Sequence, residues 1–344
     1  MSHFRDEIAE QPEVASRLLE QSHDAVAAIG ARIREVRPRG YVIAARGSSD
    51  HAALYAKYLF GVRNRALVAL AAPSLFTHYA RPPHLEGQCV IGISQSGASP
   101  DVVAVLEEAR RQGALTVAIS NTLESPLGKA AEFVLALGAG PERSVPASKT
   151  YTASLLALAL ISQAVDEDRA FEAALSMVPH AMARALEMDS AVEKLVAHLI
   201  GTRAIVLGRG FNFSTAEELA LKLMETSYVM ARAWSVADFE HGPIAVVEAG
   251  IPIVVVDGGG AVESSMGSIR ERVSAKGCPV VRLVDGKSSD VDPLTTVQVA
   301  SGLPEELTPL SLAVLAQLLA HHVAVARGFD PDSPREIRKV TRTW

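Results

Sequence analysis

The sequence predicts an α/β protein with two tandem doubly wound parallel-sheet domains that are related by an internal duplication. The chain has 344 residues, which is room for about two domains of ordinary size. Its residues are 49% hydrophobic but only 5% aromatic, so the core has to be built mainly from Ala, Val, Leu and Ile. Short apolar runs alternate with helical patterns, which is typical of parallel strands covered by helices on both faces.

The pattern of strands repeats along the chain with an offset of about 163 residues. This offset is too long for a solenoid and indicates a duplicated domain. Three strand segments correspond between the halves: residues 41–47 with 204–210, 90–94 with 253–257, and 113–119 with 277–283. We therefore expect the first domain over residues 37–165 and the second over residues 196–330.

Helices and a tail account for the rest of the chain. Residues 1–36 are expected to form an N-terminal helical segment that is interrupted at Gln11-Pro12. An Ala/Leu-rich helix over 151–165 is expected to be followed by a helical connector over 166–195. The basic residues 331–344 are expected to form a C-terminal tail.

A serine-rich loop follows the strand at residues 90–94 and contains Ser94, Gln95, Ser96, Gly97 and Ser99. Ser99 is followed by Pro100 and Asp101, which is the order of an N-cap, an N1 proline and an acidic first turn. Free amide donors of this helix start and the serine hydroxyls are suited to a phosphate group. The alternative is a serine-rich turn with an ordinary helix cap.

The end of the preceding strand carries a second candidate loop, Gly47-Ser48-Ser49. Ligands of doubly wound sheets bind outside the carboxyl ends of the strands, so the two loops are expected to share one ligand. In the second half the serine loop is replaced by Asp257-Gly258-Gly259-Gly260, where an aspartate would repel a phosphate. We therefore expect the anion in the first half only, and flexible packing or an interface at the second loop.

The second half supplies residues that are typical of catalysis. Residues 214–217 have the spacing of a capping box, and the helix after them places Glu218, Lys222 and Glu225 on one face. That face is either functional or a solvated stripe of charge pairs. His241 lies in a Gly-Pro turn, where a side chain is exposed and often functional.

Charge and composition exclude several other functions. The net charge of −6 and the absence of a basic block argue against a nucleic-acid partner. Cys89 and Cys278 match neither a metal spacing nor a disulfide framework. The chain lacks a basic-then-apolar leader, and no apolar run approaches twenty residues, so we expect a soluble cytoplasmic protein without membrane contact.

Taken together, the motifs resemble the SIS (sugar isomerase) domain family, and in particular the isomerase half of glucosamine-6-phosphate synthases. The resemblance rests on five motifs in order after Glu7-Ile8-Ala9-Glu10-Gln11-Pro12: Gly47-Ser48-Ser49, Ser94-Gln95-Ser96-Gly97, residues 222–228, Glu240-His241-Gly242-Pro243, and residues 335–344. The chain starts at Met1-Ser2 without the synthases' N-terminal glutaminase domain. It is therefore most similar to stand-alone SIS-type glucosamine-6-phosphate deaminases.

The resemblance implies roles for individual residues. Glu225 would move a proton between C1 and C2, His241 would open the sugar ring, Lys339 would close the site from the tail, and Lys222 would lie beside C2 and its nitrogen. The residues expected to bind phosphate or sugar are Gly47, Ser48, Ser49, Ser94, Gln95, Ser96, Ser99, Val145, Ala147 and Ser148. The synthases' sugar-contacting serine aligns with Ala147, with Ser148 one place later. No metal or cofactor is implied, and the partner subunit of a homodimer would donate His241.

The implied reaction is hydrolysis of glucosamine 6-phosphate to fructose 6-phosphate and ammonia. A deaminase or deglycase acting on another amino-sugar or fructosamine 6-phosphate is the alternative within enzymes. A non-catalytic sugar-phosphate sensor is the alternative of another class. Residues 1–36 are too short and too acidic for the helix-turn-helix domain that such regulators carry. A dinucleotide-binding protein is disfavoured, because no G-x-G-x-x-G motif follows the first strand.

Overall fold

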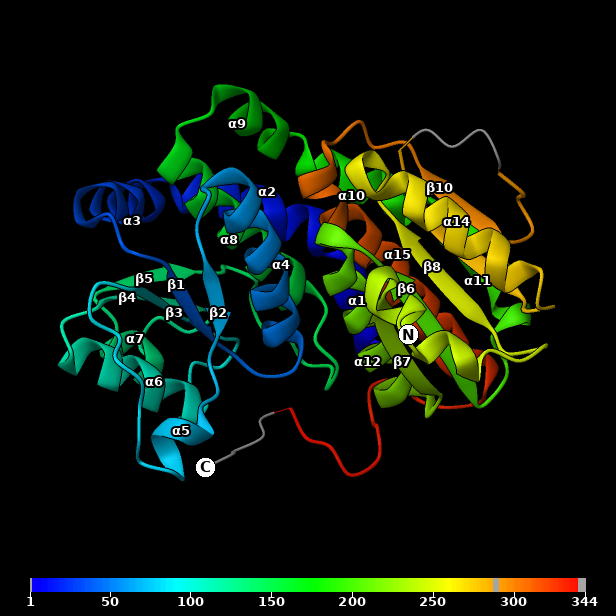
Figure 1. The fold of residues 1–344 in the computed structure, drawn as a ribbon, viewed down its shortest axis with the longest axis horizontal. Helices are drawn as coiled ribbons and strands as arrows, with labels where there is room; N and C mark the ends of the chain where they lie inside the picture. Colours follow the sequence, from blue (N-terminus) through cyan, green and yellow to red (C-terminus); the bar gives the residue numbers. More distant parts are fainter. Residues whose placement is uncertain (1, 287–290, 340–344) are drawn as a thin grey trace. The chain divides into compact units, whose positions relative to one another are not determined.

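The computed structural model describes residues 2–286 and 291–339 and contains two five-stranded parallel sheets (Figure 1). The first sheet has the order β2-β1-β3-β4-β5 and consists of Tyr41–Ala44 (β1), Val68–Leu70 (β2), Cys89–Ser94 (β3), Leu115–Ser120 (β4) and Phe133–Ala136 (β5). The second has the order β10-β9-β8-β6-β7 and consists of Arg203–Gly208 (β6), Met230–Ser235 (β7), Ile253–Asp257 (β8), Val280–Asp285 (β9) and Thr296–Val299 (β10).

The two sheets have the same topology. Numbered within each half, both orders are 2-1-3-4-5, and the paired strands within each sheet run parallel. In this doubly wound order the chain reverses its direction of progress between the first and third strands, which is where ligands bind. The expected fold class, two tandem α/β domains related by duplication, is confirmed.

Each sheet belongs to a compact unit that also recruits segments remote in sequence. Among the described residues, the first-sheet unit comprises Glu13–Glu142, Lys149–Ser176, Arg338 and Lys339. The second-sheet unit comprises the N-terminal residues up to Pro12, Arg143–Ser148 and Met177–Ile337. The short segment Arg143–Ser148 therefore packs with the second sheet, although the chain on both sides of it packs with the first.

Helices cover both faces of the first sheet (Figure 1). One face packs Val102 and Leu106 of one helix and Leu127 of the next against Val90 and Ala118 of the strands. The helices on this face are Ser74–Thr77 (α5), Pro100–Arg111 (α6) and Pro126–Ala130 (α7). The helices on the other face are His23–Val36 (α3), Ser48–Arg63 (α4) and Lys149–Asp166 (α8). The unit also contains Arg169–Ser176 (α9) and most of Gln11–Gln21 (α2), whose first two residues belong to the second-sheet unit.

The second sheet is covered in the same way. On one face Phe239, Met266 and Ile269 pack against Ile205 and Val255 of the strands. The helices on this face are Val236–Glu240 (α13) and Glu263–Ser274 (α14). The remaining helices are His3–Ala9 (α1), Val178–Glu187 (α10), Asp189–Leu195 (α11), Phe213–Ser227 (α12) and Thr308–Ala326 (α15), with 3-10 turns at Val196–His198, Gly210–Asn212, Pro243–Val246, Gly260–Val262 and Glu305–Leu307.

Helix α15 is the core helix of the second-sheet unit. Within the described chain, Glu305–Ala326 is the one helical stretch long and apolar enough to cross a membrane, and 78% of its most apolar window is buried inside the protein. A mostly buried helix of this kind is weak evidence for a membrane span, because core helices meet the same criterion. The expectation that no apolar run approaches twenty residues was therefore wrong for this 22-residue helical stretch.

Candidate active site

The serine loop of the first-sheet unit is a rigid turn at the carboxyl end of β3. The Gly97 N–H donates to the Ser94 carbonyl at 3.1 Å, and the Leu127 N–H donates to the Gly97 carbonyl at 3.0 Å. Gly97 has a φ of +62°, and a Cβ at this position would lie 2.1 Å from Ser125 Oγ. Only glycine fits both this backbone conformation and this close approach.

The helix after the loop starts where the sequence predicts. Ser99 occupies the N-cap position of α6 and Pro100 the first helical position. The Ser99 hydroxyl lies 3.3 Å from Ser94 Oγ, and within the described part of the chain it caps no amide of α6. Gln95, Ser96 and Ser99 are half-buried, so each of these residues keeps surface that solvent can reach. The loop therefore offers hydroxyls and a helix N-terminus to an anion.

The loop after β1 lies at the same edge of the same sheet. Strands β1 and β3 are paired neighbours, with Ala44 opposite Gly92. Gly47, with a φ of +56°, precedes α4, and the half-buried Ser48 and Ser49 form the first turn of that helix. Two helix N-termini with serine side chains therefore follow the two strands at which this topology places ligands.

Arg46 links the two loops and was not anticipated from the sequence. Its Nε lies 2.7 Å from Oδ2 of the buried Asp101, which is in the first turn of α6. The guanidinium compensates the charge of a carboxylate that would otherwise weaken anion binding at this helix start. The repeat contained a signal for this position, since Arg46-Gly47 corresponds to Arg209-Gly210 in the second half.

The corresponding loop of the second-sheet unit is filled by the protein's own side chains. Asp257 Oδ1 accepts a hydrogen bond from the Gly259 N–H at 2.9 Å, and Glu305 Oε2 accepts one from the Ala261 N–H at 2.7 Å. A Cβ at Gly258 would lie 2.2 Å from Asn212 Nδ2. Burial raises the pKa of both Asp257 and Glu305. The carboxylates of Asp257 and Glu305 thus occupy amide donors of this loop that could otherwise bind an anion.

Helix α12 carries a buried charge cluster. Lys222 Nζ lies 2.6 Å from Glu225 Oε2 and 3.4 Å from Glu218 Oε1. The Glu218 and Lys222 side chains are 0% and 1% exposed, whereas that of Glu225 is 22% exposed. A solvated stripe of charge pairs is therefore the wrong interpretation of this face. The cluster holds an ammonium between two carboxylates, and Glu225 is the carboxylate with exposed surface.

The start of α12 differs from the expected capping box. Asn212 occupies the N-cap position, and Ser214 and Thr215 lie inside the first turn. The Ser214 hydroxyl donates to the Phe211 carbonyl at 2.8 Å, and the Thr215 hydroxyl donates to Asn212 Oδ1 at 3.2 Å. The capping-box prediction is wrong because a 3-10 turn at Gly210–Asn212 leads directly into the helix and moves its start upstream.

His241 is exposed at the C-terminal end of α13. The backbone N–H of His241 donates to the Asp238 carbonyl at 3.1 Å, and Gly242 follows with a φ of +151°. The neighbouring Glu240 forms an ion pair with Arg272 of α14, which holds the turn against the second-sheet unit. The imidazole is therefore presented to solvent from a backbone that is fixed on both sides.

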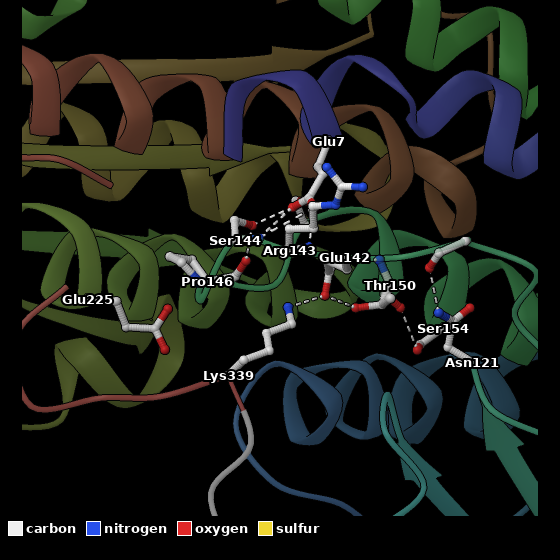
Figure 2. A network of polar contacts seen from close by, with 12 residues as sticks. Glu7, Asn121, Glu142, Arg143, Ser144, Pro146, Thr150, Ser154, Glu225 and Lys339 are labelled. Carbon is white, nitrogen blue, oxygen red and sulfur yellow. Dashed lines mark hydrogen bonds and ion pairs between the residues drawn. The ribbon is translucent and has the colours of Figure 1, made fainter. Parts of the chain in front are cut away.

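The C-terminal tail is anchored on the first-sheet unit by Lys339. Its Nζ lies 2.6 Å from Oε2 of Glu142, a carboxylate with no exposed side-chain surface (Figure 2). Glu142 also accepts hydrogen bonds from the Thr150 N–H at 3.0 Å and the Thr150 hydroxyl at 2.8 Å. Glu142 thus caps the start of α8 and pairs with the tail. The predicted tail residues beyond Lys339 lie outside the described residues.

The segment Arg143–Ser148 contains three of the predicted sugar-binding residues, and its burial alternates. Val145 and Ala147 are half-buried, whereas Ser144, Pro146 and Ser148 are buried. Val145 and Ala147 are thus available to a ligand. Ser148 has no exposed surface, and its carbonyl accepts a hydrogen bond from Gln317 at 3.3 Å.

The described residues contain no cluster of three or more His, Cys, Asp or Glu side chains that is suited to a metal ion. Cys89 and Cys278 are both buried and free. Burial raises the pKa of Cys89 to about 12 and also raises that of Cys278. These thiols are therefore poorly suited to act as nucleophiles or metal ligands at neutral pH.

A model of the SIS domain family matches residues 37–163 and residues 201–327. The chain belongs to the SIS domain family. The two matched ranges contain the two sheets, so each SIS domain contributes one copy of the repeated topology. The serine loop belongs to the first SIS domain, and the Lys222 cluster and His241 belong to the second.

Proteins named glutamine–fructose-6-phosphate aminotransferase (isomerizing) are similar to this SIS protein. The one from Bradyrhizobium diazoefficiens is 35% identical over 310 residues, which cover 86% of this chain and 51% of that protein. The one from Thermococcus kodakarensis is 33% identical over 352 residues, which cover 98% of this chain and 57% of that protein. The chain thus spans little more than half the length of these relatives.

Solved structures share the fold over nearly the whole SIS protein. A Silicibacter pomeroyi protein, provisionally assigned as a phosphosugar isomerase, is 33% identical with a TM-score of 0.88, covering 96% of this chain and 100% of its own. The C-terminal domain of a Francisella tularensis glucosamine-fructose-6-phosphate aminotransferase is 26% identical with a TM-score of 0.88, covering 97% and 98%. A Thermotoga maritima glucosamine-6-phosphate deaminase shares the fold at 20% identity, with a TM-score of 0.79 and coverage of 99% and 100%.

Proposed function

We propose that this SIS protein is a phosphosugar-binding isomerase and deaminase that converts glucosamine 6-phosphate and water to fructose 6-phosphate and ammonia. The buried ammonium of Lys222, held between Glu218 and the partly exposed Glu225, carries the proposal. A carboxylate that is held in one place and still has exposed surface is suited to taking a proton from a bound substrate and giving it back. The similarity to isomerizing aminotransferases and to a protein assigned as a phosphosugar isomerase supports the same class of reaction.

The serine loop of the first SIS domain is proposed to hold the C6 phosphate. Its support is that two helix N-termini, with the half-buried Ser48, Ser49, Ser96 and Ser99, follow neighbouring strands at the edge where this topology places ligands. The second SIS domain offers no comparable cradle within the described chain, because Glu305 and Asp257 take its loop amides. One phosphate is therefore expected per chain.

The proposed chemistry starts with opening of the sugar ring, assisted by His241. Glu225 then takes the proton from C2 of the open-chain aldehyde and returns it to C1, while a second proton passes from the C2 amino group to O1, which leaves a ketimine at C2 and a hydroxymethyl group at C1. Water adds to C2, the carbon–nitrogen bond breaks, and ammonia leaves. Lys222 supports Glu225 and lies beside the nitrogen, while Lys339 closes the site from the tail. We place this reaction in a soluble cytoplasmic homodimer.

The test is an ammonia-release assay on a panel of amino-sugar and fructosamine 6-phosphates, with the wild type, Glu225→Gln and Ser96→Ala. We expect turnover by the wild type and a loss of at least about 100-fold in kcat for Glu225→Gln with substrate binding retained. Ser96→Ala is expected to raise KM by about tenfold and to leave kcat nearly unchanged.

The same panel separates the alternatives. With fructose 6-phosphate added to the panel, deuterium incorporation from deuterated water into its C1, together with no ammonia release from any amino sugar, would identify an isomerase that is not a deaminase. Turnover of a different amino-sugar phosphate would correct the substrate. Binding of sugar phosphates without turnover of any of them would overturn the enzymatic proposal in favour of a sensor.

A further inference from the structure

The N-terminal helix α1 packs its one buried carboxylate against the segment Arg143–Ser148. Glu7 of α1 is 4% exposed and accepts hydrogen bonds from the Arg143 N–H, the Ser144 N–H and the Ser144 hydroxyl (Figure 2). The Ser144 N–H lies 3.3 Å from Glu7 Oε2. A buried carboxylate is stable only when its oxygens are satisfied in this way, so Glu7 and the start of the segment fix each other.

The other end of the segment is held by a chain of two buried amides. Gln11 Nε2 donates to Gln317 Oε1 at 2.8 Å, and Gln317 Nε2 donates to the Ser148 carbonyl at 3.3 Å. Gln11 and Gln317 are both 0% exposed. Residues from the N-terminus thus bind the first residues of the segment directly and its last residue through Gln317, all within the second-sheet unit.

Helix α1 is also anchored independently of Glu7. Phe4 and Ile8 are fully buried, and Asp332 accepts hydrogen bonds from the His3 and Phe4 N–H groups at 2.6 and 2.8 Å. A change at Glu7 therefore removes the contact with the segment while the helix stays docked. This independence makes a local test possible.

We propose that Glu7 is a positioning residue that sets the conformation of Arg143–Ser148 and so presents Val145 and Ala147 to the sugar. The buried Ser144 is hydrogen bonded to Glu7 and to the Pro146 carbonyl. The half-buried Val145 and Ala147 alternate along the segment with the buried Ser144, Pro146 and Ser148. The Ser144 hydroxyl transmits the constraint, because it contacts both Glu7 and the Pro146 carbonyl, the latter at 2.9 Å. This inference rests on the proposed function and on the expectation from the sequence resemblance that Val145 and Ala147 contact the substrate.

The experiment compares Glu7→Gln with Asp6→Asn in the full chain. Each variant removes one negative charge from α1, but Asp6 is exposed and Glu7 is buried against the segment. Glutamine keeps the size of Glu7 but has one acceptor oxygen fewer and no charge. We expect Glu7→Gln to lower kcat/KM by about tenfold, mainly through KM, because the segment contributes ground-state binding. Asp6→Asn is expected to match the wild type.

Two further measurements keep the proposal testable if Glu7→Gln also lowers stability. Ser144→Ala removes the hydroxyl that links Glu7 to Pro146, so its effect on kcat/KM is expected to be non-additive with that of Glu7→Gln. Amide hydrogen exchange of a peptide covering residues 142–149 is expected to be faster in Glu7→Gln than in Asp6→Asn, without any substrate.

The outcomes distinguish the positioning role of Glu7 from the proposed function. An active wild type with unchanged kcat/KM in Glu7→Gln would overturn the positioning role. Unchanged hydrogen exchange in the segment would also overturn it, whether or not the wild type is active. Faster exchange together with an inactive wild type would support the role of Glu7 in holding the segment and would count against the proposed function alone.

Discussion

Lys339 Nζ lies 2.6 Å from Oε2 of Glu142, and the Glu142 side chain is fully buried. A buried carboxylate needs compensation, and here a lysine of the C-terminal tail supplies it together with the Thr150 N–H and hydroxyl. The tail is therefore attached through a charge that is costly to leave unpaired. Since Lys339 is a proposed site residue, Glu142 links the tail's position to activity.

Glu142→Gln is expected to loosen the tail and to lower kcat/KM by about tenfold, because the amide retains part of the Thr150 contacts but loses the ion pair with Lys339. Limited proteolysis after the basic residues of the tail is expected to become faster. Glu86→Gln, which removes a charge from an exposed position of the same unit, serves as the control. Equal proteolysis and activity in the two variants would show that the ion pair does not hold the tail.

Gly97→Ala is expected to destabilise the fold by about 2–4 kcal/mol and to weaken binding of sugar phosphates, because the new Cβ meets both an unfavourable φ and Ser125 Oγ at 2.1 Å. Gly113→Ala is the matched control, since Gly113 has a φ of +77° but nothing within 4 Å of the added Cβ. Its expected cost is about 1 kcal/mol. Urea denaturation measures the free energy of unfolding of both variants. Equal losses in Gly97→Ala and Gly113→Ala would contradict the close packing of Gly97 against Ser125.

The parts of the site that could be predicted from the sequence are those specified by local pattern. A strand followed by small polar residues, a serine N-cap position and an N1 proline is a signal contained within about a dozen residues, and the structure has Ser99 and Pro100 where that signal places them. The spacing of Glu218, Lys222 and Glu225 likewise placed them on one face. The repeat offset predicted two duplicated doubly wound domains, and the two sheets have the same strand order.

What could not be predicted depends on partners remote in sequence. The same three charged residues fit a solvated stripe until α12 packs into the second-sheet unit, where Glu218 and Lys222 are buried. Glu142 pairs with a lysine 197 residues away, and Glu7 binds the backbone of a residue 136 positions away. A single acidic residue carries no local sign of such a partner. The capping-box prediction failed for a local reason, since the preceding 3-10 turn changed where α12 begins.

His241 is expected to act in the partner subunit of the proposed homodimer, because its imidazole is exposed on a fixed turn. Inactive Glu225→Gln and His241→Ala homodimers should then regain activity when they are mixed and allowed to exchange subunits. A mixture at equal concentrations is expected to recover about a quarter of the wild-type rate, since half of the dimers are mixed and each has one intact site. If subunits are shown to exchange and activity does not recover, the proposal that His241 acts in the partner subunit is wrong.

Acid is expected to destabilise the second-sheet unit through His321 of α15. Burial is the main cause that lowers the pKa of His321 to about 4; the nearby His322 and Arg5 act in the same direction, whereas Asp189 and Asp332 oppose the shift. The unfolded chain binds the proton at a higher pH than the folded protein, so stability is complete above the ordinary histidine pKa of 6.5. It is lost as the pH falls from 6.5 towards about 4.

Replacing His321 with leucine should remove this loss, because leucine fills the half-buried site beside Phe4 without binding a proton. After allowance for partial exposure, the wild type is expected to lose about 1–2 kcal/mol more than His321→Leu over this pH range. His23→Leu, at an exposed position, is the control. Urea denaturation at several pH values measures the difference, and parallel acid losses in the wild type and His321→Leu would show that another group drives the transition.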